Sequence, residues 1–111
     1  MNLLELKEKL NATGLPVAYS HFIETESFRP PQPPYITYLE APSSNFFADN
    51  KTYKKVINVD IELYTNKKDL ESEAKIEKML DENDIPYETN ETWIETEKLY
   101  QRIYEIGVIP K

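Results

Sequence analysis

The chain has 111 residues, a formal net charge of −7 and no cysteine. This length is typical of one compact domain, and we expect a single domain over residues 1–111. The absence of cysteine excludes a disulfide framework, a thiolate metal site and a cysteine nucleophile. Apolar runs are far shorter than the roughly 20 residues of a membrane-spanning helix, and the N-terminus lacks the basic and apolar regions of a signal peptide. The sequence therefore predicts a soluble intracellular protein that contacts no membrane.

The acidic residues are concentrated in the last third of the chain. Eleven Asp and Glu side chains lie between Asp69 and Glu97, where the only basic residues are Lys75 and Lys78. Proteins that bind along the phosphate backbone of a nucleic acid carry positively charged surfaces, whereas this segment is acidic. We therefore expect no sequence-specific nucleic-acid binding. The acidity fits a solvated helix face with edge strands kept soluble by carboxylates, or a surface for a basic partner.

The first half of the chain predicts a helix followed by two strands. Leucines at helical spacing predict a helix over residues 3–10, which Gly14 would end. Alternating side chains predict a strand over 15–22. Four prolines within residues 29–34 favour polyproline II and exclude helix or sheet interior. A second strand is expected over 35–40.

The second half predicts a long strand, a helix and two further strands. Turn residues make 43–50 a loop, and strict alternation predicts a central strand from Tyr53 to Tyr64. Thr65-Asn66 would end this strand and cap a helix over 69–83, with Asp69 in its first turn. The inward side chains are expected to be Ile57, Val59, Ile61 and Leu63 in the strand, and Leu70, Ala74, Ile76, Met79 and Leu80 in the helix.

The last quarter of the chain fits two interpretations. Residues 87–93 favour extended structure, whereas 97–106 fit both a strand and a helix ending at Gly107. We favour a strand over 97–106 because Tyr, Ile and Val dominate it. The order helix, three strands, helix, two strands predicts an α+β fold, in which an antiparallel or mixed sheet of about five strands carries two helices on one face.

Residues suited to catalysis are few. Ser20 and His21 are neighbours, and adjacent strand side chains point to opposite faces, so we do not expect them to act as nucleophile and base. Asp60 and Glu62 share a strand face and could hold a hard cation, as a metal-dependent nuclease requires. Tyr64 stands where such a nuclease site would place a lysine. We therefore expect these carboxylates to be a solvent face, and we predict no catalytic residue, no metal site and no cofactor.

Two segments suggest interaction surfaces. The proline run has the PxxP spacing of ligands for aromatic grooves, which makes Arg29, Pro31 and Pro33 candidate interface residues, although we favour the reading of the run as a stiff connector to the next strand. Phe46 and Phe47 are adjacent aromatic residues in a polar loop. Exposed apolar groups of this kind often mark a contact site, unless one ring packs under the sheet.

Several strings along nearly the whole chain resemble a family of small proteins encoded in prophages of Gram-positive bacteria. These strings are Leu15-Pro16-Val17-Ala18-Tyr19-Ser20-His21-Phe22, Pro33-Pro34-Tyr35-Ile36-Thr37-Tyr38-Leu39, Asn45-Phe46-Phe47-Ala48-Asp49-Asn50, Ile61-Glu62-Leu63-Tyr64-Thr65-Asn66-Lys67-Lys68-Asp69 and Tyr100-Gln101-Arg102-Ile103-Tyr104-Glu105-Ile106.

The resemblance implies a structural protein of long-tailed bacteriophages, either a tail terminator or a head–tail joining component. It implies a small α+β fold that forms a homo-oligomeric ring, often a hexamer, on the tail tube, in contact with other tail or connector proteins. The expected location is the virion, assembled in the bacterial host cytoplasm. A metal-dependent nuclease that uses Asp60 and Glu62, and a peptide-binding adaptor, are the alternative readings of the sequence.

Overall fold

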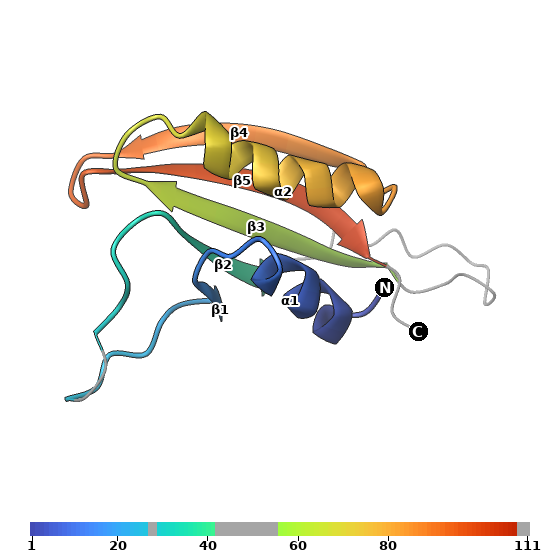
Figure 1. Cartoon of the computed structure of the whole chain (residues 1–111), viewed down its shortest axis with the longest axis horizontal. Coiled ribbons are helices and arrows are strands. Elements are labelled where there is room, and N and C mark those ends of the chain that lie inside the picture. Colours follow the sequence, from blue (N-terminus) through green and yellow to red (C-terminus); the bar gives the residue numbers. More distant parts are fainter. Residues whose placement is uncertain (27–28, 42–55, 109–111) are drawn as a thin grey trace.

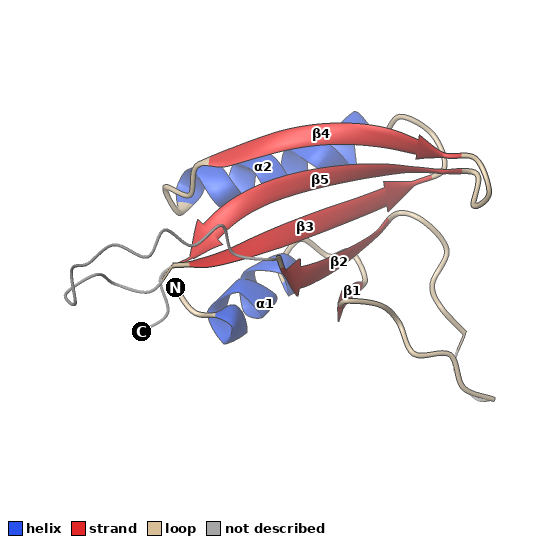
Figure 2. Cartoon of the chain, turned by 180° about the vertical axis from the view of Figure 1, so that it is seen from behind, coloured by secondary structure: helices blue, strands red, loops and turns tan. Residues whose placement is uncertain are grey.

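A computed structural model describes residues 1–26, 29–41 and 56–108 of the chain. The described elements are α1 (Leu3–Asn11), β1 (Val17–Tyr19), β2 (Tyr35–Glu40), β3 (Ile57–Thr65), α2 (Leu70–Glu82), β4 (Tyr87–Ile94) and β5 (Leu99–Val108). The strands form one sheet in the order β1-β2-β3-β5-β4, in which β1 runs parallel to β2 and the other neighbours are antiparallel. Both helices lie on the same face of this sheet (Figure 1), and the opposite face carries no helix (Figure 2). The prediction of an α+β fold with a mixed sheet and two helices on one face is confirmed.

The core lies between the sheet and the two helices. The alternation of the central strand is confirmed, because Val59, Ile61 and Leu63 are buried and Ile57 packs against them. Among the described residues, the buried hydrophobic core consists of Leu6, Leu10, Ile36, Tyr38, Val59, Ile61, Leu63, Ile76, Met79, Leu80, Tyr104, Ile106 and Val108. The same register places the intervening side chains of β2, β3 and β5 on the face without helices.

Local capping explains where the first helix begins and ends. The Asn2 side chain accepts a hydrogen bond from the backbone N–H of Glu5 at 2.8 Å, which satisfies a first-turn donor. After the helix, the Thr13 hydroxyl donates to the carbonyl of Leu10, and Gly14 has a φ of 86°. This left-handed conformation favours glycine, so the predicted stop at Gly14 is confirmed.

Helix α2 differs from its prediction in its cap and in its buried side. Asp69, rather than Thr65-Asn66, is the N-cap, and Thr65 is the last residue of β3. Leu70 is 69% exposed and Ala74 is also exposed, whereas Ser72 and Glu73 are buried. The helix therefore turns a polar side toward part of the sheet, and only Ile76, Met79 and Leu80 of the predicted apolar side are in the core.

A network of charged side chains explains the buried Glu73. Arg102 on β5 lies 3.3 Å from Glu73 and 3.9 Å from Glu77 on α2, while Lys68 lies 2.8 Å from Glu73. Lys68 and Arg102 also pair with Glu91 on β4, at 3.0 and 3.8 Å. A carboxylate facing the sheet is tolerated at this end of α2 because two cations compensate its charge.

Several strand boundaries differ from the sequence prediction. The first strand covers only Val17–Tyr19 instead of 15–22, because Ser20 has a φ of 66° and leaves the sheet. Residues 53–55 of the predicted central strand lie outside the described residues. The segment 97–106 is a strand, as predicted, but its strand begins at Leu99 and continues through Gly107 to Val108.

No helix in the three described ranges is both long and apolar enough to cross a membrane.

Candidate interaction surface

The face of the sheet opposite the helices, which we call the open face, is the main candidate surface of the described chain. Its side chains come from alternate positions of β2, β3, β5 and β4, and the register aligns them in rows across the sheet. The rows across these four strands are Tyr35–Tyr64–Gln101–Thr92, Thr37–Glu62–Ile103–Asn90 and Leu39–Asp60–Glu105–Glu88. Figure 2 shows this face toward the viewer.

The middle of the open face is a hydrogen-bonded polar cluster around Glu62. Its carboxylate accepts from the Thr37 hydroxyl at 2.8 Å and from the Gln101 side-chain amide at 3.2 Å. The same amide donates to the Tyr64 hydroxyl at 2.9 Å. Thr37 is only 4% exposed. The open face is thus not a simple solvated surface at this point, because the side chains around Glu62 order its carboxylate and partly desolvate it.

Aromatic side chains extend this cluster toward β2. The ring of Tyr35 stacks on that of Tyr64 with centroids 5.1 Å apart, and Phe22 meets Tyr35 edge-on at 5.5 Å. Burial raises the pKa of both Tyr35 and Tyr64 above the usual value for tyrosine. Stacked, half-buried tyrosines with hydroxyls at the surface are typical of protein contact sites.

A row of three carboxylates crosses the other end of the open face. Glu105 on β5 lies directly opposite Asp60 on β3 and directly opposite Glu88 on β4. Like charges directly opposite each other destabilise a sheet. Desolvation by burial raises the pKa of Asp60, so this carboxylate is held in an unfavourable environment. We call Asp60, Glu105 and Glu88 the acidic row.

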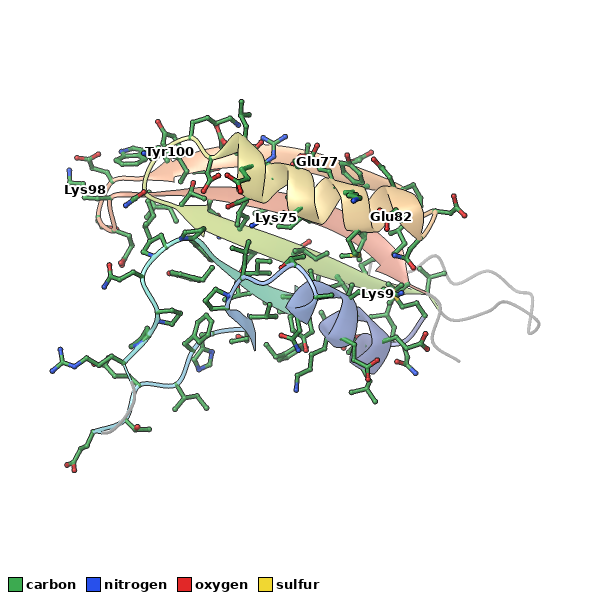
Figure 3. All side chains as sticks on the ribbon, in the orientation of Figure 1. Lys9, Lys75, Glu77, Glu82, Lys98 and Tyr100 are labelled. Carbon is green, nitrogen blue, oxygen red and sulfur yellow. The ribbon has the colours of Figure 1, made fainter. Side chains whose placement is uncertain are left out.

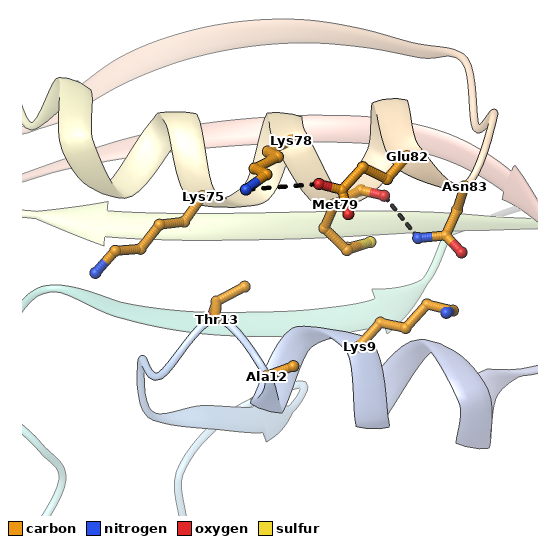
Figure 4. Close-up of a pocket in the computed structure, with 8 residues that line it drawn as sticks. All are labelled: Lys9, Ala12, Thr13, Lys75, Lys78, Met79, Glu82 and Asn83. Carbon is orange, nitrogen blue, oxygen red and sulfur yellow. Dashed lines mark hydrogen bonds and ion pairs between the residues drawn. The ribbon is translucent and has the colours of Figure 1, made fainter.

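The opposite side of the molecule carries a groove between α1 and α2 (Figure 4). It has a volume of about 390 Å³, and we call it the helix groove. Its lining residues are Lys9, Ala12, Thr13, Lys75, Lys78, Met79, Glu82 and Asn83. Figure 3 shows Lys9 on α1 and Lys75 on α2, both on the helix side of the molecule. Three lysines against one glutamate make this lining basic.

The Ser20–His21 pair does not have the geometry expected from the sequence. Ser20 leaves the sheet with a positive φ, so the two side chains do not point to opposite faces. His21 Nδ1 and Ser20 Oγ are 3.1 Å apart, within hydrogen-bond distance, in an exposed position. The expectation that these side chains could not meet was wrong, because it assumed that the strand continued to Phe22.

Of the candidate interface residues of the sequence, the structure describes Arg29, Pro31 and Pro33. Phe46 and Phe47 lie outside the described residues. Arg29 is exposed, and Pro31 and Pro33 are half-buried, in a segment that lies away from the sheet on its way to β2 (Figure 1). The peptide bond between Pro33 and Pro34 is cis.

Sequence reasoning placed Asp60 and Glu62 on one strand face but missed the partners that surround them. Alternation in β3 shows which side chains share a face, whereas Thr37 and Gln101 reach Glu62 only through the register with β2 and β5. Within residues 1–26, 29–41 and 56–108, no group of three or more His, Asp or Glu side chains is arranged to hold a metal ion.

Comparisons of the chain with protein-family models, with curated proteins and with solved structures found no match.

Proposed function

We propose that this protein is a structural subunit of a long-tailed bacteriophage, a tail terminator or head–tail joining component that forms a ring on the tail tube. It has no catalytic role in this proposal. The ring consists of copies of this chain and contacts other tail or connector proteins in the virion.

The observation that carries the proposal is the open face, taken together with the resemblance of the sequence strings. An α+β sheet with helices on one face only leaves a large surface for a partner, and the resemblance implies a fold of this kind. The open face combines stacked tyrosines, half-buried polar groups and unbalanced carboxylates. Ordered and partly desolvated side chains of this kind are better suited to a permanent contact than to a purely solvated surface.

Deletion of the gene from the prophage that encodes it tests the proposal. We expect the deletion to yield filled heads and tails that fail to join, or tails of irregular length, in electron micrographs. Supplying the wild-type chain in trans should restore joined virions. Normal virions at the wild-type yield after deletion would overturn the proposal.

The nuclease alternative makes a different prediction for Asp60 and Glu62. If those carboxylates held a catalytic cation, Mg²⁺ or Mn²⁺ would stimulate DNA cleavage, and Asp60→Asn with Glu62→Gln would abolish it. Under our proposal, the wild type shows no metal-stimulated cleavage. Cleavage by the wild type that the double variant lacks would favour the nuclease.

A further inference from the structure

We propose that the open face of one copy docks, through its acidic row, against the basic helix groove of a second copy. The inference rests on the proposed function, because it names the contact by which the subunits of the ring associate. The partner is thus another copy of this chain, and the contact is heterologous, with different surfaces on its two sides.

The charge of the open face is complementary to that of a cationic partner. Its strand positions include four carboxylates, on Asp60, Glu62, Glu88 and Glu105, and no Lys or Arg. Glu62 accepts hydrogen bonds from neighbouring side chains, whereas the acidic row places three carboxylates opposite one another across three strands. A cationic surface laid on this row would remove the repulsion that the isolated sheet retains.

The helix groove supplies cations of the required kind. Lys75 and Lys78 are 42% and 79% exposed at the side chain, and each forms a long ion pair within α2, with Nζ of Lys75 4.0 Å from Glu71 and Nζ of Lys78 3.7 Å from Glu82. Exposed pairs on one helix are weak. The lysines can therefore turn to carboxylates of a neighbour at little cost, and Met79 offers an apolar floor beneath them.

The positions of the two surfaces favour a chain of contacts rather than a closed pair. Helices α1 and α2, whose residues line most of the helix groove, face the viewer in Figure 1, and the sheet face without helices is turned to the viewer after the 180° rotation of Figure 2. Each copy can thus offer its open face to one neighbour and its groove to another. Heterologous contacts of this kind close into a ring when the rotation between copies permits it.

Charge-reversal variants test the contact in sedimentation velocity and native mass measurements. The row variant carries Glu88→Lys and Glu105→Lys, and the groove variant carries Lys75→Glu and Lys78→Glu. We expect the wild type to assemble at about 20 mM salt and to dissociate partly at about 500 mM, since salt screens exposed charges. Each variant alone should remain monomeric, with self-association weakened at least ~10-fold.

An equimolar mixture of the two variants provides the decisive measurement. The row of each variant is then complementary in charge to the groove of the other, but not to its own groove. The mixture should assemble into oligomers that contain equal numbers of the two variants, and a single chain with all four substitutions should also assemble. Circular dichroism should show that all variants are folded.

Matched controls change the same charge elsewhere. Glu24→Lys with Glu26→Lys, and Lys7→Glu with Lys67→Glu, alter exposed residues that belong to neither surface. Both controls should assemble like the wild type.

Three outcomes would overturn the inference: wild-type protein that stays monomeric, row and groove variants that assemble normally, or a mixture that remains monomeric. If any of these occurs while the gene deletion still prevents tail joining, the contact is wrong and the proposed function stands. If the mixture assembles as described and the deletion has no effect on virions, the contact is right and the proposed function is wrong.

Discussion

Tyr104 connects the sheet to α2 from the interior of the protein. It is fully buried, and its hydroxyl donates to a carboxylate oxygen of Glu77 at 2.7 Å. Arg102 Nε donates to the same hydroxyl oxygen at 3.1 Å, and the guanidinium lies 5.6 Å from the ring centroid. The side chain therefore joins the apolar core to the charged network between β5 and α2.

Tyr104→Phe should lower the free energy of unfolding by about 1–2 kcal/mol at pH 7, because the half-buried carboxylate of Glu77 and the Arg102 N–H each lose a partner. Urea denaturation followed by circular dichroism measures this difference. A variant with wild-type stability would show that the hydroxyl contributes nothing to folding. Tyr87→Phe is the matched control, since Tyr87 contacts Tyr104 edge-on from β4 and is only half-buried.

The same substitution should change the response to alkaline pH. Burial, followed by the hydrogen bond to Glu77, raises the pKa of Tyr104 far above its unfolded value of 10.0. The folded state then holds the proton more tightly, so stability is retained below pH 10 and decreases as the pH rises above it. The wild type should lose stability above this pH more steeply than Tyr104→Phe.

Val59 tests the orientation of the central strand. It is completely buried, with Ile61 and Leu63 on the same face. Val59→Asp should lower the free energy of unfolding by several kcal/mol, because an unpaired charge would enter the core. Thr92→Asp, at an exposed position of β4, is the control and should have little effect. Equal melting temperatures for the two variants would contradict the assigned face.

Among the elements, α2 depends on a single residue for its start. Asp69 accepts hydrogen bonds from the Ser72 backbone N–H at 3.0 Å and from the Ser72 hydroxyl at 2.9 Å. The backbone hydrogen bond from Ser72 is the main reason why the pKa of Asp69 lies below its usual 3.8. The charged form of the side chain therefore stabilises the helix.

Asp69→Ala should lower the free energy of unfolding by about 1 kcal/mol at pH 7, the usual effect of losing an N-cap. A depressed pKa contributes stability above the unfolded value of 3.8 and loses it as the pH falls through the lower folded value. The difference between wild type and Asp69→Ala should therefore shrink at acid pH. Asp69→Asn keeps an acceptor and should lose less at pH 7. Thermal melts of the three proteins at several pH values measure both effects. A stability difference between wild type and Asp69→Ala that does not change with pH would contradict the prediction.

At the scale of the whole molecule, we expect a second subunit contact besides the one between the open face and the helix groove. Phe46 and Phe47 are predicted from the sequence to anchor a subunit contact. Phe46→Ala with Phe47→Ala should leave the monomer folded and prevent ring formation, because aromatic anchors often contribute about 2 kcal/mol or more each. Sedimentation velocity measures the assembly, with circular dichroism as the folding control. Outright unfolding would place the rings in the core, and normal assembly would place the contact elsewhere.

The sequence determined the features that depend on neighbouring residues. Alternation in β3 identified the buried Val59, Ile61 and Leu63, and the helix stop at Gly14 followed from its freedom to adopt a positive φ. These are local properties, because the spacing of two residues along a strand or helix determines whether their side chains point to the same face.

Only the tertiary structure decided which segments face one another. Glu62 meets Thr37 and Gln101, which are 25 and 39 residues away in sequence, and their contact depends on the pairing register. Glu73 is buried rather than exposed because Arg102 and Lys68 both pair with its carboxylate, and the periodicity of the helix does not predict these partners. The opposition of Asp60, Glu105 and Glu88 likewise arises from three strands aligned by long-range backbone pairing, which the charge of each strand alone does not specify.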